Sequence, residues 1–231
     1  MRPEERLIVA LDVSSAVETK SLVRALGKTV STYKVGTQLF TAEGPSVVRE
    51  LVQSGKKVFL DLKFHDIPNT VAGGVRSAAA MGVAMLTVHA AGGSAMLRAA
   101  VEAARQAPKP PIVLAVTVLT SLSDADLHET GIAGRTRDHA LLLATLAQNC
   151  GCNGVVASPR EARIIRQDLG VGFVIVTPGI RPAGSAMGDQ SRTNTPAEAI
   201  AAGADYLVVG RPITEAKDPQ RAAEEILKEI G

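Results

Sequence analysis

The stretch IVLAVTVL at residues 112–119 is a continuous run of apolar, mostly β-branched side chains that ends at Thr120 and Ser121. A strand without alternating polar residues is typical of a parallel sheet that is buried on both faces. The sequence therefore predicts a central strand of a parallel sheet at this place.

Similar short apolar runs occur along the whole chain. Including the first, they cover residues 7–12, 32–36, 57–63, 85–90, 112–119, 154–158, 173–177 and 206–210. Amphipathic stretches separate them, and 231 residues over eight units give about 29 residues for each strand, helix and pair of loops. We predict an α/β fold, a (β/α)8 TIM barrel, with residues 1–231 forming a single domain. A doubly wound open sheet is the alternative, but it usually has fewer strands.

Helix start and stop signals fit this pattern. Ser14 and Ser15 can cap a first helix that Gly27 ends, and a second helix is expected at residues 45–54, beginning with a proline. Asp218 is a suitable N-cap for a last helix that continues to Ile230. Two longer loops are expected at residues 120–137 and 179–194, both after strands, at the face where barrels build active sites.

Composition limits the partners. Lys and Arg number 25 and Asp and Glu 23, which leaves a net charge of +2 and argues against nucleic-acid or anionic-membrane binding. The near-apolar run at residues 78–86 is much shorter than the roughly 20 residues that span a bilayer. The first residues show no apolar stretch typical of a signal peptide. We expect a cytoplasmic enzyme with no membrane or nucleic-acid partner.

The densest polar feature is DLKFHD at residues 61–66, at the end of the third predicted strand. Side chains alternate along a strand, so Asp61 and Lys63 should share a face. Asp12 ends the first predicted strand and the second carries Lys34 just before Gly36, and buried charges are costly unless they pair. We therefore expect these four side chains to cluster at the carboxyl ends of the strands. A purely structural ion pair is the alternative.

Two Gly-Arg turns follow the last two predicted strands. Gly179 precedes Arg181, and Gly210 precedes Arg211. Barrels often bind phosphate at these loops, where glycine allows close backbone approach and arginine donates two hydrogen bonds. The sequence predicts a phosphate site there.

The carboxylates near Lys63 stabilise its protonated amine. A Schiff-base lysine needs an apolar or cationic environment instead, so Lys63 is better suited to donate a proton or to stabilise a carbanion. A metal site is disfavoured, because Lys34 and Lys63 neutralise the carboxylates that would hold a cation. Cys150 and Cys152 have the wrong spacing for a metal motif and are expected to be buried thiols.

The decapeptide DLKFHDIPNT at residues 61–70 resembles the signature of the orotidine 5′-phosphate decarboxylase family, in its bacterial branch. Shorter matches in the same order lie at residues 11–12, 33–36, 118–121, 177–181 and 209–212. The resemblance implies decarboxylation of orotidine 5′-phosphate to uridine 5′-phosphate, the last step of de novo pyrimidine nucleotide synthesis, with neither a metal nor an organic cofactor.

The resemblance also implies residue roles. Lys63 would protonate C6 as carbon dioxide leaves, with Asp61 holding Lys63 near the substrate carboxylate. Asp66 and Thr70 would enter the site of a second subunit, so the active unit would be a homodimer. The other substrate-binding residues would be Asp12 and Lys34 at the ribose, Thr120 at the pyrimidine, and Arg181, Gln190, Gly210 and Arg211 at the base and phosphate.

Three other functions stay open on the residues alone. The nearest is a sugar-phosphate decarboxylase or aldolase of the same barrel superfamily, which resembles this chain in its Asp-x-Lys-x-x-Asp turn. Such enzymes usually need a divalent metal and place an acid at the end of strand two, where this chain has Lys34. A Schiff-base aldolase and a catalytically silent phosphate-binding barrel are the others. His65 and His89 are expected to pack or to hydrogen-bond rather than to act as acids or bases.

Overall fold

The computed structural model describes residues 1–182 and 194–231 of the chain. Eight parallel strands form a closed barrel in the order in which they occur in the sequence. The strands are β1 (Leu7–Ala10), β2 (Thr32–Gly36), β3 (Lys57–Phe64), β4 (Met85–His89), β5 (Ile112–Val116), β6 (Gly154–Val156), β7 (Val174–Thr177) and β8 (Tyr206–Val209). The predicted TIM barrel is confirmed, and the open sheet is excluded because β1 pairs with β8.

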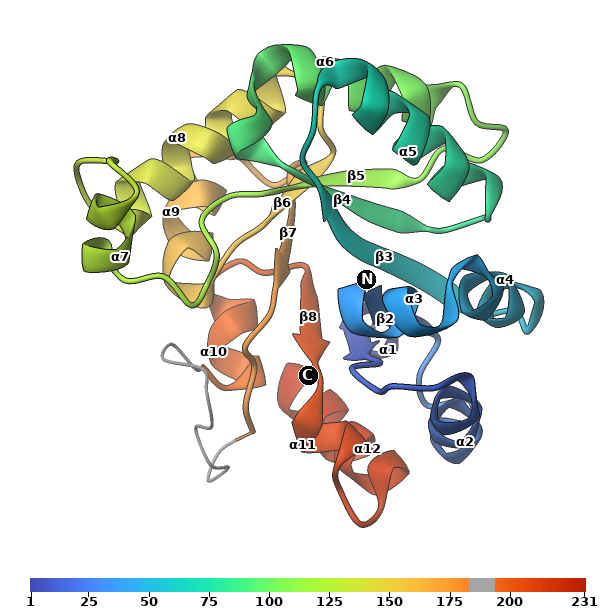
Figure 1. Ribbon diagram of the computed structural model, residues 1–231. Helices are drawn as coiled ribbons and strands as arrows, with labels where there is room; N and C mark the ends of the chain where they lie inside the picture. The colour runs from blue at the N-terminus through green and yellow to red at the C-terminus, as the bar shows by residue number, and fades with distance from the viewer. Residues whose placement is uncertain (183–193) are drawn as a thin grey trace.

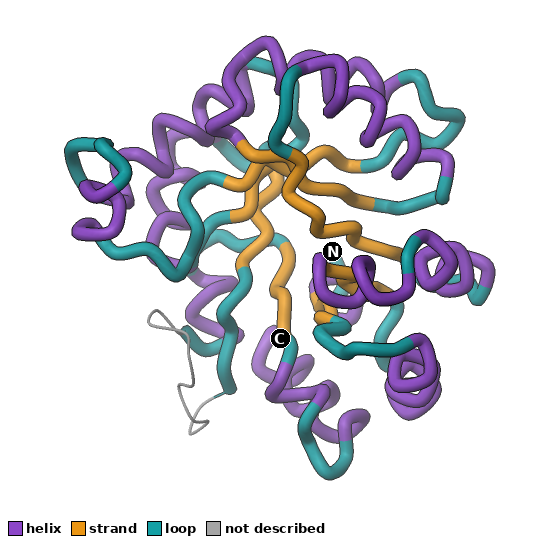
Figure 2. Tube along the Cα trace, viewed as in Figure 1, coloured by secondary structure: helices purple, strands orange, loops and turns teal. Residues whose placement is uncertain are grey.

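Helices surround the barrel (Figures 1 and 2). They are α1 (Pro3–Arg6), α2 (Ala16–Leu26), α3 (Thr37–Glu43), α4 (Pro45–Gln53), α5 (Pro68–Ala80), α6 (Gly93–Arg105), α7 (Asp124–Glu129), α8 (Thr136–Asn149), α9 (Pro159–Leu169), α10 (Pro196–Ala201), α11 (Arg211–Thr214) and α12 (Pro219–Ile230), with a 3-10 turn η1 (Ala90–Gly92). No helix in the described part of the chain is long and apolar enough to cross a membrane.

The predicted caps are present. Ser15 Oγ accepts a hydrogen bond from the Glu18 amide at the start of α2, and Gly27 ends that helix with a φ of 53°. Asp218 caps α12 through the Arg221 amide. Hydrogen-bonding side chains just before these helices satisfy amides that have no partner within the helix, which explains why the boundaries could be predicted.

Several predicted boundaries were wrong. Five of the eight strands end before the predicted residue: β1 at Ala10 instead of residue 12, for example, and β5 at Val116 instead of residue 119. The predicted loop at residues 120–137 contains α7, because Ser123 and Asp126 form a reciprocal cap that starts a short helix. Helices α1 and α3 were not predicted; both are short, with seven residues or fewer.

Two apolar layers hold the fold together. One fills the barrel itself and consists of Ile8, Ala10, Phe59, Met85, Leu114, Val176 and Val208. The other lies between the barrel and its helices. Burial of apolar area is the main stabilising contribution in such a fold. Ala10, Phe59 and Val208 also line a cavity above the inner layer, so that layer forms the floor of the cavity.

Candidate active site

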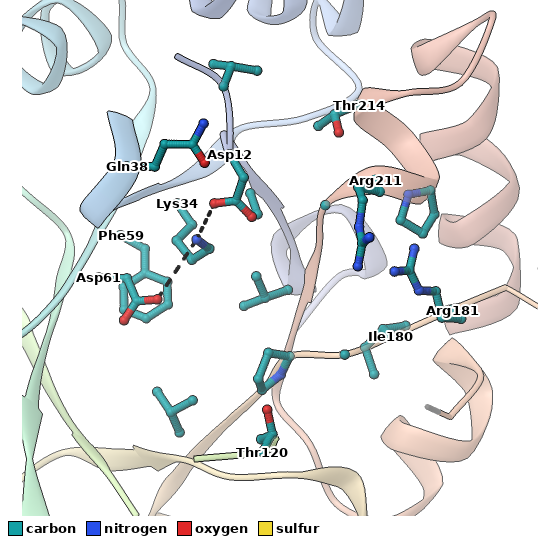
Figure 3. Close-up of a pocket in the computed structure, with 18 of the residues that line it drawn as sticks. Asp12, Lys34, Gln38, Phe59, Asp61, Thr120, Ile180, Arg181, Arg211 and Thr214 are labelled. Atoms are coloured by element: carbon teal, nitrogen blue, oxygen red, sulfur yellow. Dashed lines mark hydrogen bonds and ion pairs between the residues drawn. The ribbon is translucent and has the colours of Figure 1, made fainter. Parts of the chain in front are cut away.

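A cavity of about 730 Å³ opens at the carboxyl ends of the strands (Figure 3). Eight of the predicted site residues line it: Asp12, Lys34, Asp61, Lys63, Thr120, Arg181, Gly210 and Arg211. In Figure 3, Asp12, Lys34 and Asp61 lie on one side of the cavity and the two arginines on the other. The cavity therefore has an acid–lysine wall and a cationic wall.

The acid–lysine wall is a chain of ion pairs. Lys34 Nζ donates to Asp12 Oδ1 at 2.8 Å and lies 4.0 Å from Asp61 Oδ2. Lys63 Nζ lies 2.9 Å from each carboxylate oxygen of Asp61. The Asp61 and Lys34 side chains are only 12% and 13% exposed, whereas Lys63 is 35% exposed. The predicted cluster is confirmed, and of its two lysines Lys63 has the shorter contacts with Asp61 and the more exposed side chain.

Glycine gives this cluster its space. A Cβ at Gly36 would lie 3.0 Å from Lys34 Nζ and 3.5 Å from Asp12 Oδ1. The contact at 3.0 Å would require the lysine amine to shift slightly, whereas 3.5 Å is an ordinary van der Waals contact. The end of β2 therefore carries no side chain next to the Lys34–Asp12 pair.

The cationic wall consists of Arg181, after β7, and Arg211, at the start of α11. Burial lowers the pKa of Arg181, and the nearby positive charge of Arg211 lowers it further, whereas Glu215 opposes the shift. Two guanidinium groups held close together repel each other, and an anion that binds both of them removes that repulsion. This wall has the chemistry of a phosphate or carboxylate site.

Sequence reasoning missed one polar pair at the cavity. Gln38 Nε2 donates to Ser14 Oγ at 3.0 Å, and both side chains line the cavity beside Asp12. Gln38 lies in α3, which was itself not predicted. Its position directly after the second predicted strand was the only feature of the sequence that could have indicated Gln38 as a site residue.

A family model described as orotidine 5′-phosphate decarboxylase / HUMPS matches residues 5–226. The chain belongs to this family. A relative from Idiomarina loihiensis named orotidine 5′-phosphate decarboxylase is 54% identical over 226 residues, covering 98% of both chains. One from Halorhodospira halophila with the same name is also 54% identical, over 98% of this chain and 96% of that protein. A crystal structure of orotidine 5′-phosphate decarboxylase from Lactobacillus acidophilus superposes with a TM-score of 0.87 at 41% identity, covering 97% and 98% of the two chains.

The family signature at residues 61–70 is divided between two places in the fold. Asp61 and Lys63 line the cavity, whereas Asp66 and Thr70 are exposed and are not among its lining residues. Asp66 Oδ1 accepts a hydrogen bond from the Ile67 amide at 2.6 Å, and Ile67 is 68% exposed. Within one chain, therefore, two of the predicted site residues are not brought to the pocket. Gln190, the remaining one, lies outside the described residues.

The remaining candidates lie at the edge of the site or away from it. The rings of His65 and His89 have centroids 5.2 Å apart, and burial, His65 and Lys63 together lower the pKa of His89, against an opposing effect of Asp61. Cys150 and Cys152 are buried free thiols, as predicted, and burial raises the pKa of Cys152 to about 12. In the described ranges, no three His, Cys, Asp or Glu side chains are arranged to hold a metal ion.

Proposed function

We propose that this chain decarboxylates orotidine 5′-phosphate to uridine 5′-phosphate, the last step of de novo pyrimidine nucleotide synthesis, without a metal or an organic cofactor. Family membership and the names of relatives at 54% identity support the reaction. The observation that carries the mechanism is the Lys63 ammonium, held 2.9 Å from both oxygens of Asp61 at the cavity wall.

Decarboxylation of this nucleotide requires a positive charge close to C6 of the pyrimidine ring. When the bond from C6 to the carboxylate breaks, carbon dioxide leaves and the electron pair stays on C6 in an orbital that cannot delocalise into the ring. A preorganised positive charge stabilises that developing anion. Lys63 then transfers a proton from Nζ to C6, which forms the new C–H bond and leaves a neutral amine that solvent reprotonates. Asp61 holds the amine in place.

The other residues of the site would bind the rest of the nucleotide. Asp12 and Lys34 would contact the ribose hydroxyls, and Thr120 the pyrimidine. Arg181, Gly210 and Arg211, together with Gln190, would bind the base and the phosphate. The phosphate would bind at the cationic wall, and the bond that breaks would lie at the acid–lysine wall. The phosphate would therefore supply binding energy from a part of the substrate that does not react.

We expect orotidine 5′-phosphate to lose its absorbance when the purified chain is added, at the same rate in buffer with and without a chelator. The reason is that Lys34 and Lys63 flank Asp61, so the cluster already carries its own positive charges. A decarboxylase or aldolase that acts on sugar phosphates with a divalent metal would be inhibited by the chelator instead. Absence of turnover with this nucleotide would contradict the proposal.

We also propose that residues 1–231 act as one barrel domain in a cytoplasmic homodimer, with Asp66 and Thr70 contributed to the partner's site. Their exposure, and their absence from the cavity of their own chain, support this arrangement. In a symmetric dimer the same rim of each subunit faces the other subunit. The exposed turn of each subunit can then complete the site of its partner.

The shared site predicts complementation between two inactive variants. In a mixed dimer of Lys63→Ala and Asp66→Ala subunits, one site carries both substitutions and the other carries none. Equal mixing and random exchange would therefore restore about a quarter of the native activity. The measurement is turnover after the two variants are unfolded and refolded together, with each variant refolded alone as the control. If Asp66 served its own chain, every site would keep one substitution and activity would stay low.

A further inference from the structure

Thr87 lies in β4 and is completely buried, and its hydroxyl joins the two central residues of the site. Thr87 Oγ1 accepts a hydrogen bond from the backbone amide of Lys63 at 2.8 Å and donates one to Asp61 Oδ1 at 3.0 Å. The same Asp61 oxygen lies 2.9 Å from Lys63 Nζ. One hydroxyl therefore fixes the backbone of the lysine and the carboxylate that holds its amine.

These contacts lie where β3 departs from regular pairing with β4. Leu60 pairs with Leu86 and Phe64 with Val88, so four steps along β3 match only two along β4. The extra residues form a bulge opposite Thr87, and bulges re-aim side chains next to active sites. The Lys63 amide donates to the Thr87 side chain within this bulge.

Lys63 itself has an unusual backbone. Its φ is 52°, and it is the one non-glycine residue with a positive φ among the residues that the structure describes. A side chain beyond Cα disfavours this left-handed conformation, so surrounding contacts must hold it. The Thr87 hydroxyl supplies a hydrogen bond directly to the amide of this residue.

We propose that Thr87 is a positioning residue for the decarboxylation: its hydroxyl holds Lys63 in the left-handed conformation that places the ammonium over Asp61 and toward the cavity. This role rests on the proposed function. Thr87 is not among the cavity-lining residues, so it acts through Lys63 and Asp61 rather than on the nucleotide. A misplacement of about 1 Å in a reacting group can reduce a rate by about 10²-fold.

The test compares variants of similar shape. Thr87→Val keeps the branched side chain but removes the hydroxyl, whereas Thr87→Ser keeps the hydroxyl. With Thr87→Val we expect kcat for orotidine 5′-phosphate to fall by about 10²-fold. KM should change less than about 3-fold, because the ribose and phosphate contacts are untouched. Thr87→Ser should keep kcat within about 5-fold of the native value.

Thr32→Val is the matched control. Thr32 is buried, like Thr87, but at the start of β2, at the opposite end of the barrel from the cavity. It should leave kcat at the native value, because it removes a buried hydroxyl away from Lys63 and Asp61. If Thr87→Val does not fold, Thr87→Ala and Thr87→Ser make the same comparison between a side chain without and one with a hydroxyl.

The proposal is overturned if the variant without the hydroxyl keeps nearly native kcat, if serine does not rescue it, or if the whole loss appears in KM. If the native chain and Thr87→Val turn over the nucleotide equally well, only the positioning role of Thr87 is rejected. Native chain without any turnover rejects the decarboxylase assignment, and with it this role.

Discussion

Lys63→Ala is expected to lower kcat for orotidine 5′-phosphate by at least about 10⁴-fold, because a general acid and an electrostatic donor are lost together. The chain should still fold. The lysine side chain is 35% exposed, and Asp61 keeps the Thr87 hydrogen bond and Lys34 at 4.0 Å. We expect the free energy of unfolding to fall by no more than about 2 kcal/mol. Steady-state turnover and urea unfolding of the same preparation measure the two effects.

Lys57→Ala is the control for this variant. Lys57 begins β3, the strand that carries Lys63, and its side chain is exposed at the opposite end of the barrel. It removes the same charge from the chain without touching the cavity, so turnover should stay native. Decarboxylation by Lys63→Ala at a rate within about 10-fold of the native chain would reject the role of the amine.

The barrel could be predicted because its signals are local. Each strand is a short apolar run. Residues such as Ser15 and Asp218 mark helix starts because each accepts a hydrogen bond from the amide three residues later. The exact strand ends could not be predicted in the same way. Asp12 continues the β1 run in sequence but lies beyond its last paired residue, since pairing depends on where neighbouring strands leave the barrel.

The cluster around Asp61 shows a similar limit. Alternation along a strand predicted that Asp61 and Lys63 would lie together, and they do, although Lys63 has a left-handed backbone inside a bulge. Thr87 could not be found this way. It lies 26 residues from Asp61 in sequence, and its contacts exist only because β4 pairs with the bulged part of β3. In the sequence it is one threonine in the short run MLTVHA at residues 85–90.

Asp66 and Thr70 are predicted site residues that lie away from the cavity of their own chain. They follow Asp61 and Lys63 closely in sequence, yet the chain turns into α5 after Ile67 and both residues lie on the exposed rim. Their proposed role was implied by the family resemblance and needs a second subunit.

Arg211→Ala should weaken the use of the phosphorylated substrate specifically. A charge-assisted, two-pronged hydrogen bond to phosphate contributes roughly 3 kcal/mol, so kcat/KM for orotidine 5′-phosphate should fall by about 10²-fold. Part of the loss should appear in kcat, because binding energy at the phosphate is used to organise the site for reaction. Product inhibition by uridine 5′-phosphate should weaken by a similar factor.

The phosphate-free nucleoside orotidine separates this effect from general damage to the site. Turnover of orotidine should be slow in the native chain and unchanged in Arg211→Ala, because the substituted group has no phosphate to bind. Arg221→Ala provides the matched control: this arginine is on α12, its side chain is 76% exposed, and it pairs only with Glu225 at 3.1 Å among the ion pairs described. If the native chain handled nucleoside and nucleotide alike, or if Arg211→Ala lowered both equally, the cationic wall would not be a phosphate site.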